Sequence, residues 1–216
     1  MRPAPAVTLK HPIAIVLASA LIIAGCDDRS AERHPNPTGP LNGKRIAILA
    51  TDGVEEDELR EPRQALDAAG ATTLLVSPKD GRVHMWSHSD WGDYESVDTV
   101  LNQARADSFD GLVLPGGVMN PDALRLDAQA IAFATAFVAA RKPIAAICHG
   151  PWLLIEAGGV KGKTLTSWPS LRDDLGNAGA TWVDQEVVRS GELVTSRKPA
   201  DIPEFDRQII LLFSGR

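Results

Sequence analysis

The chain has 216 residues, a formal net charge of −6 and 44% hydrophobic residues. This length accommodates one ordinary α/β domain and a short additional segment. Nucleic-acid binding requires a basic surface, so the acidic balance predicts no nucleic-acid partner.

The first 25 residues have the pattern of a signal peptide. Arg2 and Lys10 form a positive start, and residues 13–24 form an apolar core that is shorter than the roughly 20 residues needed to span a bilayer. The core ends in residues 23–26 (IAGC), which resemble the lipobox of bacterial lipoproteins. The resemblance implies cleavage before Cys26 and lipidation of its thiol. An ordinary secretory signal and an uncleaved anchor are the alternatives.

Residues 26–43 are expected to form a flexible tether, because they are polar and rich in proline and glycine. Asp27 resembles the inner-membrane retention signal of enteric bacteria, which implies a lipid anchor on the periplasmic side of the inner membrane. Removal of the signal would take the net charge from −6 to −8. With Cys26 lipidated, Cys148 is the sole thiol, so no internal disulfide can form.

The folded domain is expected over residues 44–216. Residues 44–50 predict a buried strand, and the next turn leads into a helix that starts with the acids 55–58 and ends at Gly70. Pro62 should kink or thin the first turns of this helix. The acids at 55–57 have a simple explanation as solvated first-turn residues or interface groups.

Further elements follow in alternation. We expect a strand at 72–76, an irregular stretch rich in His and Trp at 82–94, a short amphipathic helix at 97–106, a strand with a glycine loop at 110–117 and a long helix at 122–140. Residues 143–147 form an apolar run that predicts a buried parallel strand. Small strands are expected at 164–166, 181–183, 186–188 and 193–195, and a closing helix at 203–213 capped by Asp201 or nearby residues. This order predicts an α/β fold with a doubly wound parallel sheet, helices on both faces and ligands at the carboxyl ends of the strands.

Cys148 stands at a strand-to-helix break. It follows the strand at 143–147 and precedes a helix over 152–157 that Gly158-Gly159 closes. This position is that of a nucleophile elbow, where the turn projects the sulfur and the helix dipole favours the thiolate. The first helix amides can also receive an oxyanion. The alternative is a buried structural cysteine.

Three blocks together resemble the PfpI family of the class I glutamine-amidotransferase-like superfamily, which includes the Parkinsonism-associated deglycase. They are residues 53–59 (GVEEDEL), 112–117 (LVLPGG) and 146–151 (AICHGP). Motifs after Asp174 extend the resemblance to about residues 44–215. It implies a flavodoxin-like fold, a homodimer or homohexamer and no cofactor. Family members are described as cysteine peptidases, as cofactor-independent glyoxalases and as deglycases.

The resemblance also assigns roles to single residues. Cys148 matches the nucleophile, and Glu58 matches an acid at the end of the first strand that hydrogen-bonds the sulfur. Gly117 and the elbow amides, including that of His149, match the oxyanion site. Asp122 matches an acid that peptidase proposals draw from a neighbouring subunit. Trp152 replaces a glutamine common in the family, which is expected to change the pocket wall.

Two ionisable residues beside the sulfur leave alternatives open. If Glu58 touches Cys148, the two groups cannot both stay ionised cheaply, so one of them must hold a proton. Glu58 could also be one more first-turn acid. His149 is either a base that activates the thiol or a residue that hydrogen-bonds the backbone and shapes the turn.

The His/Trp stretch suggests a lip over Cys148. Trp86 and Trp91 would give it an apolar wall and His88 a polar contact, although a dimer contact is the alternative. No third histidine stands nearby, so the sequence predicts no metal site.

These observations predict a cysteine enzyme that attacks small reactive carbonyls or glycated amines and thiols and forms a hemithioacetal at Cys148. A cysteine peptidase is the alternative enzyme. A redox-sensing or chaperone-like thiol module is the non-enzymatic alternative.

Overall fold

The computed structural model describes residues 1–3 and 38–216. Cys26, most of the predicted signal and most of the predicted tether lie outside the described residues. Among the helices that are described, none combines the length and apolar character needed to cross a membrane.

A seven-stranded sheet forms the centre of the domain, in the order β10-β11-β7-β6-β1-β2-β5. The bounds are β1 (Arg45–Leu49), β2 (Thr72–Ser77), β5 (Thr99–Val100), β6 (Gly111–Leu114), β7 (Ile144–Ile147), β10 (Val187–Ser190) and β11 (Leu193–Ser196). All neighbours pair in parallel except β10, which is antiparallel to β11 across a two-residue turn that Gly191 enters with φ +63°. The predicted doubly wound α/β sheet is therefore confirmed, with one antiparallel edge strand.

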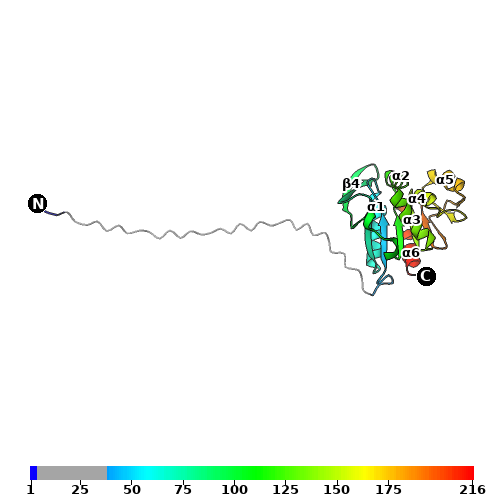
Figure 1. Ribbon diagram of the computed structural model, residues 1–216, viewed down its shortest axis with the longest axis horizontal. Helices are drawn as coiled ribbons and strands as arrows, with labels where there is room; N and C mark the ends of the chain where they lie inside the picture. Colours follow the sequence, from blue (N-terminus) through cyan, green and yellow to red (C-terminus); the bar gives the residue numbers. More distant parts are fainter. Residues whose placement is uncertain (4–37) are drawn as a thin grey trace. The chain divides into compact units, whose positions relative to one another are not determined.

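Helices cover both faces of this sheet (Figure 1). Ala47 and Leu49 of β1 pack in a cluster with α3 (Ala128–Ala139) and α4 (Pro151–Glu156). Ile46 and Ile48 pack in the other cluster, with α1 (Glu56–Ala68) and α6 (Ile202–Phe213). Successive strand residues point to opposite faces, so a strand covered on both sides is apolar throughout.

The parallel strands β1, β6 and β7 end at the same edge of the sheet. The loops that follow them, at 50–55, 115–118 and 148–150, therefore meet there. Each of the three sequence blocks that resemble the PfpI family overlaps one of these loops.

The prediction of an irregular stretch at 82–94 is wrong. These residues form an antiparallel hairpin of β3 (Arg82–Ser87) and β4 (Asp90–Ser96), with a register irregularity between His84 and Trp86. Only Val83 and Met85 of the hairpin point into the core. The aromatic and charged residues of the outer face hide this short alternation in the sequence.

The predicted helix at 97–106 is also wrong. The segment contains β5, a 3₁₀ turn at Leu101–Gln103 and a second at Ala106–Ser108. Its start is held in extended form, because the Asp98 side chain accepts a hydrogen bond from the Leu75 backbone N–H of β2 and the Val97 N–H donates to the Gly81 carbonyl.

The predicted long helix at 122–140 is two helices, α2 (Met119–Leu124) and α3. Asp127 separates them, since its carboxylate caps α3 by accepting from the N–H groups of Gln129 and Ala130. Asp201 does not cap α6 with its side chain and instead binds Arg197. The remaining elements are β8 (Thr164–Leu165), β9 (Thr181–Trp182), α5 (Arg172–Asn177) and 3₁₀ turns at Pro169–Leu171 and Pro199–Asp201.

Candidate active site

Cys148 lies at the sharp turn between β7 and α4. Its φ of +60° is in the left-handed region, which non-glycine residues rarely adopt. Gly150 permits the turn, because a Cβ there would lie 2.2 Å from the carbonyl oxygen of Leu114. The Cys148 carbonyl accepts a hydrogen bond from the Trp168 N–H at 2.9 Å. The predicted elbow is therefore present, and its strained residue is the cysteine itself.

The Glu58 carboxyl lies against this cysteine. Glu58 is the third residue of α1, not the end of the first strand, and it is fully buried. Its Oε2 accepts a hydrogen bond from the Gly116 N–H at 2.8 Å. A Cβ added at Gly116 would lie 2.5 Å from Glu58 Oε2 and 2.7 Å from Cys148 Cβ, so only glycine fits between the two side chains. Glu58 Oε1 accepts no hydrogen bond from an N–H or O–H group of the described residues.

Burial and mutual repulsion control the charges of this pair. Burial raises the pKa of Glu58 to about 8, while the Gly116 N–H and the Cys148 thiol act in the opposite direction. Burial also raises the pKa of the Cys148 thiol, and the Glu58 carboxylate raises it further. The pair therefore loses at most one proton near neutral pH, and the remaining proton is held between sulfur and carboxyl.

His149 contacts the sulfur directly. Its Nδ1 lies 3.2 Å from Cys148 Sγ, and its Nε2 lies 3.4 Å from the Ser170 hydroxyl. The ring stacks on Trp168, with the ring centres 6.1 Å apart. Burial lowers the pKa of His149 to about 4, so the imidazole is neutral above about pH 5. A neutral imidazole in this place can exchange a proton with the sulfur but supplies no positive charge to it.

Backbone N–H groups converge on the sulfur from two loops. Those of His149 and Gly117 both lower the pKa of the Cys148 thiol. Gly117 has φ +76°, and a Cβ there would lie 2.3 Å from the Gly53 carbonyl oxygen. The buried Asn120 fixes this loop, since its side-chain amide donates to the carbonyls of Pro115 and Gly116, each at 3.0 Å. The arrangement suits an oxyanion formed beside Cys148.

A pocket of about 430 Å³ opens over Cys148. Its wall is made by Glu55, Glu58, Trp86, His88, Gly117, Val118, Met119, Cys148, His149, Trp168 and Pro199. Trp86 and His88 thus line the pocket together with the cysteine.

Three other candidate residues lie outside this lining. Trp91 stacks on His84 at 4.4 Å between ring centres. The Trp152 ring lies 5.4 Å from that of His149, centre to centre, and its Nε1 donates to Asp174 Oδ2 at 2.8 Å. Asp122 is exposed on α2. A role of Asp122 in the site of a neighbouring subunit stays a prediction.

The structure adds residues that the sequence did not single out as site residues: Glu55, Asn120, Trp168 and Ser170. No spacing in the sequence marks Asn120, Trp168 or Ser170. The sequence explains Glu55 as a first-turn acid, but Glu55 precedes α1 and lines the pocket.

The fold and the elbow define a class: an α/β protein with a cysteine at the nucleophile position and a buried acid beside it. Residues 44–212 match the model of the DJ-1/PfpI family, and the chain belongs to that family. It is 41% identical over 169 residues to a protein of Bacillus subtilis named "Putative cysteine protease YraA", covering 78% of this chain and 98% of that one.

Two further relatives support the assignment. A deglycase of Pyrococcus abyssi is 40% identical over 168 residues, with coverage of 78% of this chain and 98% of the relative. The crystal structure of Drosophila melanogaster DJ-1beta superposes with a TM-score of 0.73 at 31% identity, over 80% of this chain and 91% of that one.

Proposed function

We propose that this protein is a cofactor-independent enzyme that acts on small reactive carbonyls, of the glyoxalase or deglycase type, with Cys148 as nucleophile. The observation that carries the proposal is the buried Glu58 carboxyl against Cys148, with its pKa raised to about 8. An acid with a pKa near the working pH can take and return a proton within one turnover.

In the first step Cys148 Sγ attacks the aldehyde carbon of a dicarbonyl such as methylglyoxal. A sulfur–carbon bond forms, the carbonyl π electrons move to oxygen, and the thiol proton passes through Glu58 to that oxygen. The N–H groups of Gly117 and His149 stabilise the negative oxygen while it exists. The product of this step is a hemithioacetal.

The second stage moves a proton and consumes water. Glu58 takes the proton from the former aldehyde carbon and returns it to the neighbouring carbon, while the hydroxyl proton of the hemithioacetal moves to the neighbouring carbonyl oxygen. The product is the thioester of a 2-hydroxy acid. Hydrolysis of the thioester yields lactate and restores the thiol. For a glycated amine of the aminocarbinol type, Cys148 Sγ takes the place of the amine: the sulfur–carbon bond forms, the carbon–nitrogen bond breaks, and the amine leaves with the thiol proton. The hemithioacetal so formed then follows the same steps to the hydroxy acid. The neutral His149 imidazole, 3.2 Å from the sulfur, is placed to orient the thiol.

The size of the pocket favours small substrates. A pocket volume of about 430 Å³ is at the lower end of the range for small-molecule sites. Trp86 and Trp168 form part of the pocket wall. A dicarbonyl or a single modified side chain fits this volume.

The test is lactate production from methylglyoxal and release of free amine from a methylglyoxal-modified amino acid, using the purified protein. Cys148→Ala should abolish both activities, while Asp122→Asn, on an exposed residue outside the pocket, should retain them. Absence of both activities in the unmodified protein would refute the proposal. Sulfinate formation at Cys148 without either activity would instead indicate a redox-sensing thiol module.

A cysteine peptidase is the second candidate, since one relative at 41% identity carries that name. It would require an acyl-enzyme at Cys148 and room for a polypeptide, with Asp122 supplied by a neighbouring subunit of a homodimer or homohexamer. Casein cleavage that is lost in both Cys148→Ala and Asp122→Asn would support this candidate.

We further propose that the mature chain begins at Cys26 and is held by acyl chains at the periplasmic side of the inner membrane. The support is the IAGC sequence at residues 23–26 and the aspartate that follows it. Mass spectrometry of the N-terminal peptide from membranes, compared with Cys26→Ser, tests this proposal. An unmodified residue 26 in the membrane-derived protein would contradict it.

A further inference from the structure

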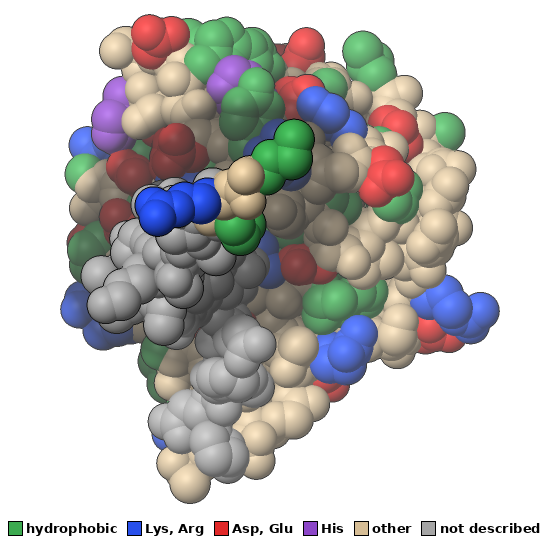
Figure 2. All heavy atoms as spheres, turned by 90° about the vertical axis from the view of Figure 1, so that its left-hand side faces the viewer, with side chains coloured by type: hydrophobic (Ala, Val, Ile, Leu, Met, Phe, Trp, Pro, Cys, Tyr) green, Lys and Arg blue, Asp and Glu red, His purple; other side chains and the backbone are tan. Residues whose placement is uncertain are grey.

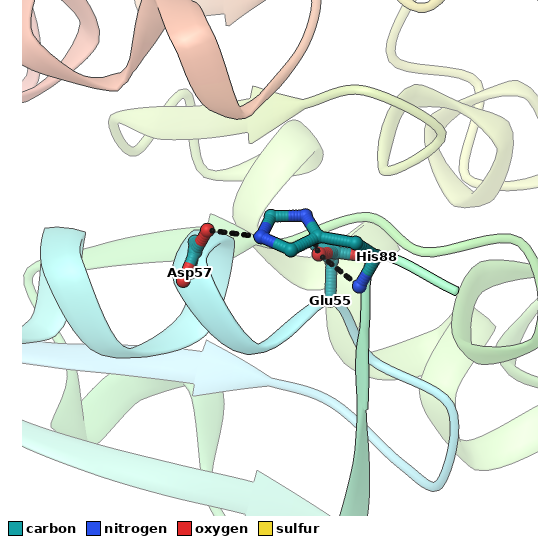
Figure 3. A group of neighbouring side chains, drawn as sticks. All are labelled: Glu55, Asp57 and His88. Atoms are coloured by element: carbon teal, nitrogen blue, oxygen red, sulfur yellow. Dashed lines mark hydrogen bonds and ion pairs between the residues drawn. The ribbon is translucent and has the colours of Figure 1, made fainter. Parts of the chain in front are cut away.

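Glu55, Asp57 and His88 meet beside the pocket, although the sequence separates the histidine from the acids by about thirty residues (Figure 3). His88 Nε2 lies 3.4 Å from Asp57 Oδ2, and its Nδ1 lies 3.3 Å from Glu55 Oε1. One ligand atom from each residue lies within 4.8 Å of the other two. On the surface that contains α1 and β4, histidine and acidic side chains gather near the top of the view (Figure 2).

These separations fit a shared metal ion better than strong hydrogen bonds. Good N–H···O bonds have donor–acceptor distances of about 2.7–3.2 Å. Two ligands of a tetrahedral zinc ion, each about 2.1 Å from the metal, lie about 3.4 Å apart. The His88 Nε2–Asp57 Oδ2 pair already has that separation, and one ligand atom from each of the three residues lies within 4.8 Å of the other two.

The cluster of Glu55, Asp57 and His88 contains two acidic side chains and one histidine, so it has an excess of negative charge. Glu55 is 8% exposed, so its carboxylate is largely removed from solvent. Arg60, the nearest arginine on α1, is engaged by Glu56, Asp93 and Glu95. Among the described residues, His88 is the sole basic side chain that pairs with Glu55 or Asp57. A divalent cation would neutralise both carboxylates, which one imidazole cannot do.

A second observation comes from the interior of the same pocket. Glu58 is fully buried, reaches the pocket wall, and leaves its Oε1 without an N–H or O–H partner among the described residues. The wall of one pocket therefore offers oxygen atoms from two carboxyl groups, Glu55 and Glu58, and carboxyl oxygen is a ligand that zinc accepts.

The backbone holds the histidine in place over the acids. His88 is at the tip of the β3–β4 hairpin with φ +57°, and its N–H donates to Glu55 Oε1 at 3.1 Å. The Trp86 N–H donates to the Val54 carbonyl at 2.7 Å, which ties the hairpin to the segment before α1. The side chains are thus brought together without a ligand, as a preorganised site requires.

We propose that Glu55, Asp57 and His88 bind a zinc ion at the mouth of the pocket, with one coordination position open to solvent or substrate. Imidazole with two carboxylates is a donor set that zinc accepts, and three protein ligands with an open position are typical of accessible zinc sites. The sequence predicted no metal because the second and third ligands come from α1 and its approach, not from the His/Trp stretch. This inference does not depend on the proposed carbonyl chemistry.

The test is zinc titration by calorimetry on the purified full-length protein, with Cys148→Ser used as the background to exclude the thiol. We expect one equivalent of zinc to bind. His88→Ala and Asp57→Asn should each weaken binding by at least about tenfold. His84→Ala is the matched control, because His84 is on the same hairpin but stacks between Trp91 and Tyr94; it should bind zinc like the background.

Cobalt(II) provides a readout independent of affinity and of enzyme activity. The cobalt-loaded protein should show ligand-field absorption without a thiolate charge-transfer band, and His88→Ala should lose that absorption. Three results would overturn the proposal: no zinc binding in the background protein, unchanged binding in His88→Ala, or binding in the wild type that Cys148→Ser abolishes.

Discussion

At the scale of single residues, the site depends on two groups that cannot both be charged. Glu58 and Cys148 are buried side by side with one glycine, Gly116, between them. The carboxyl keeps its proton to about pH 8, and its ionised form opposes the ionisation of the thiol. The sulfur therefore stays a protonated thiol in the free enzyme, and it becomes a nucleophile only when another group accepts its proton.

This coupling gives a prediction for Glu58→Gln. The amide cannot become an anion, so the thiol loses the repulsion that raises its pKa, while the effect of burial remains. The pH midpoint for alkylation of Cys148 should fall by at least about one unit, which corresponds to removal of one nearby like charge. Iodoacetamide labelling from pH 5 to 10 measures it, with Asp122→Asn as the control. A midpoint that is unchanged or higher in Glu58→Gln would contradict the assigned coupling.

The residues of the site were predictable to the extent that they lie in continuous motifs. Cys148, His149 and Gly117 each adjoin a strand end, and strand ends of a parallel sheet converge. Asn120 and Trp168 were not predictable, because their roles come from hydrogen bonds and ring stacking across separate loops. Trp152 was expected at the pocket, but it lies outside the lining and its Nε1 donates to Asp174.

At the scale of elements, the β3–β4 hairpin carries Trp86 and His88 to the pocket and must be fixed on α1. Arg63 of α1 is 3% exposed and forms ion pairs with Glu95 at 3.0 Å and with Asp98. It also donates to the Thr73 hydroxyl at 3.2 Å. One buried guanidinium thus joins α1, β2 and the hairpin.

Removal of this guanidinium should destabilise the protein and loosen the hairpin. Arg63→Ala removes the buried cation that pairs with two partly buried carboxylates, and breaking a fully buried pair in this way costs about 3–5 kcal/mol. Since Asp98 is partly exposed, we expect the lower end, about 3 kcal/mol, from urea denaturation. Arg105→Ala, which removes an exposed pair with Asp107, should leave the urea midpoint unchanged. Equal effects of the two substitutions would show that the Arg63 network does not hold the hairpin.

The elbow gives a second prediction at this scale. Gly150 has no room for a Cβ, and a glycine with free space around it, Gly176, serves as the control. A Cβ at Gly150 would lie 2.2 Å from the Leu114 carbonyl oxygen, so Gly150→Ala must displace α4 from β6. A loss of about 2 kcal/mol or more is expected, together with most of the activity. Gly176 in α5 has nothing within 4 Å of its added Cβ, so Gly176→Ala should stabilise the protein by about 0.5–1 kcal/mol. Thermal and urea denaturation measure both changes, and a harmless Gly150→Ala would contradict the described packing.

Helices and strands were predictable from the sequence where the pattern of apolar residues continued without interruption through the whole element. The buried strands β1, β6 and β7 and the amphipathic helices α1 and α6 stand where the sequence placed them. The long helix at 122–140 failed, because the Asp127 side chain captures the N–H groups that would have continued it. The hairpin failed for another reason: its outer face carries residues with no apolar alternation, and its pairing depends on α1 beneath it.

At the scale of the whole molecule, two carboxyl groups have pKa values that burial raises to near neutral, which makes stability depend on pH. Glu58 has a pKa raised to about 8, and Asp206 of α6 has a pKa raised to about 7 by burial and then by Glu61 of α1. His149 acts in the opposite sense, since burial lowers its pKa to about 4. The net charge alone predicts none of this, because the effect depends on which acids the fold buries.

The direction follows from proton binding in the two states. Between about pH 4.5 and 8 the folded protein keeps the proton of Glu58 while the unfolded chain has lost it, so the free energy of unfolding falls as the pH rises. Asp206 adds to this fall up to about pH 7. From about pH 4 to 6.5 His149 opposes it, because the unfolded chain then binds a proton that the folded protein does not.

We therefore predict that stability declines most clearly between about pH 6.5 and 8, where His149 no longer compensates. The slope should be on the order of 1 kcal/mol per pH unit for each acid still protonated in the folded state. Glu58→Gln should remove most of the decline up to pH 8, and Asp206→Asn only the part below about pH 7. Urea denaturation at half-unit steps, with Asp122→Asn as the exposed control, distinguishes the two contributions. If stability rose from pH 6.5 to 8, or if Glu58→Gln kept the wild-type slope, the Glu58 carboxyl would have to be ionised in the folded protein, and it could not serve as the proton carrier for Cys148.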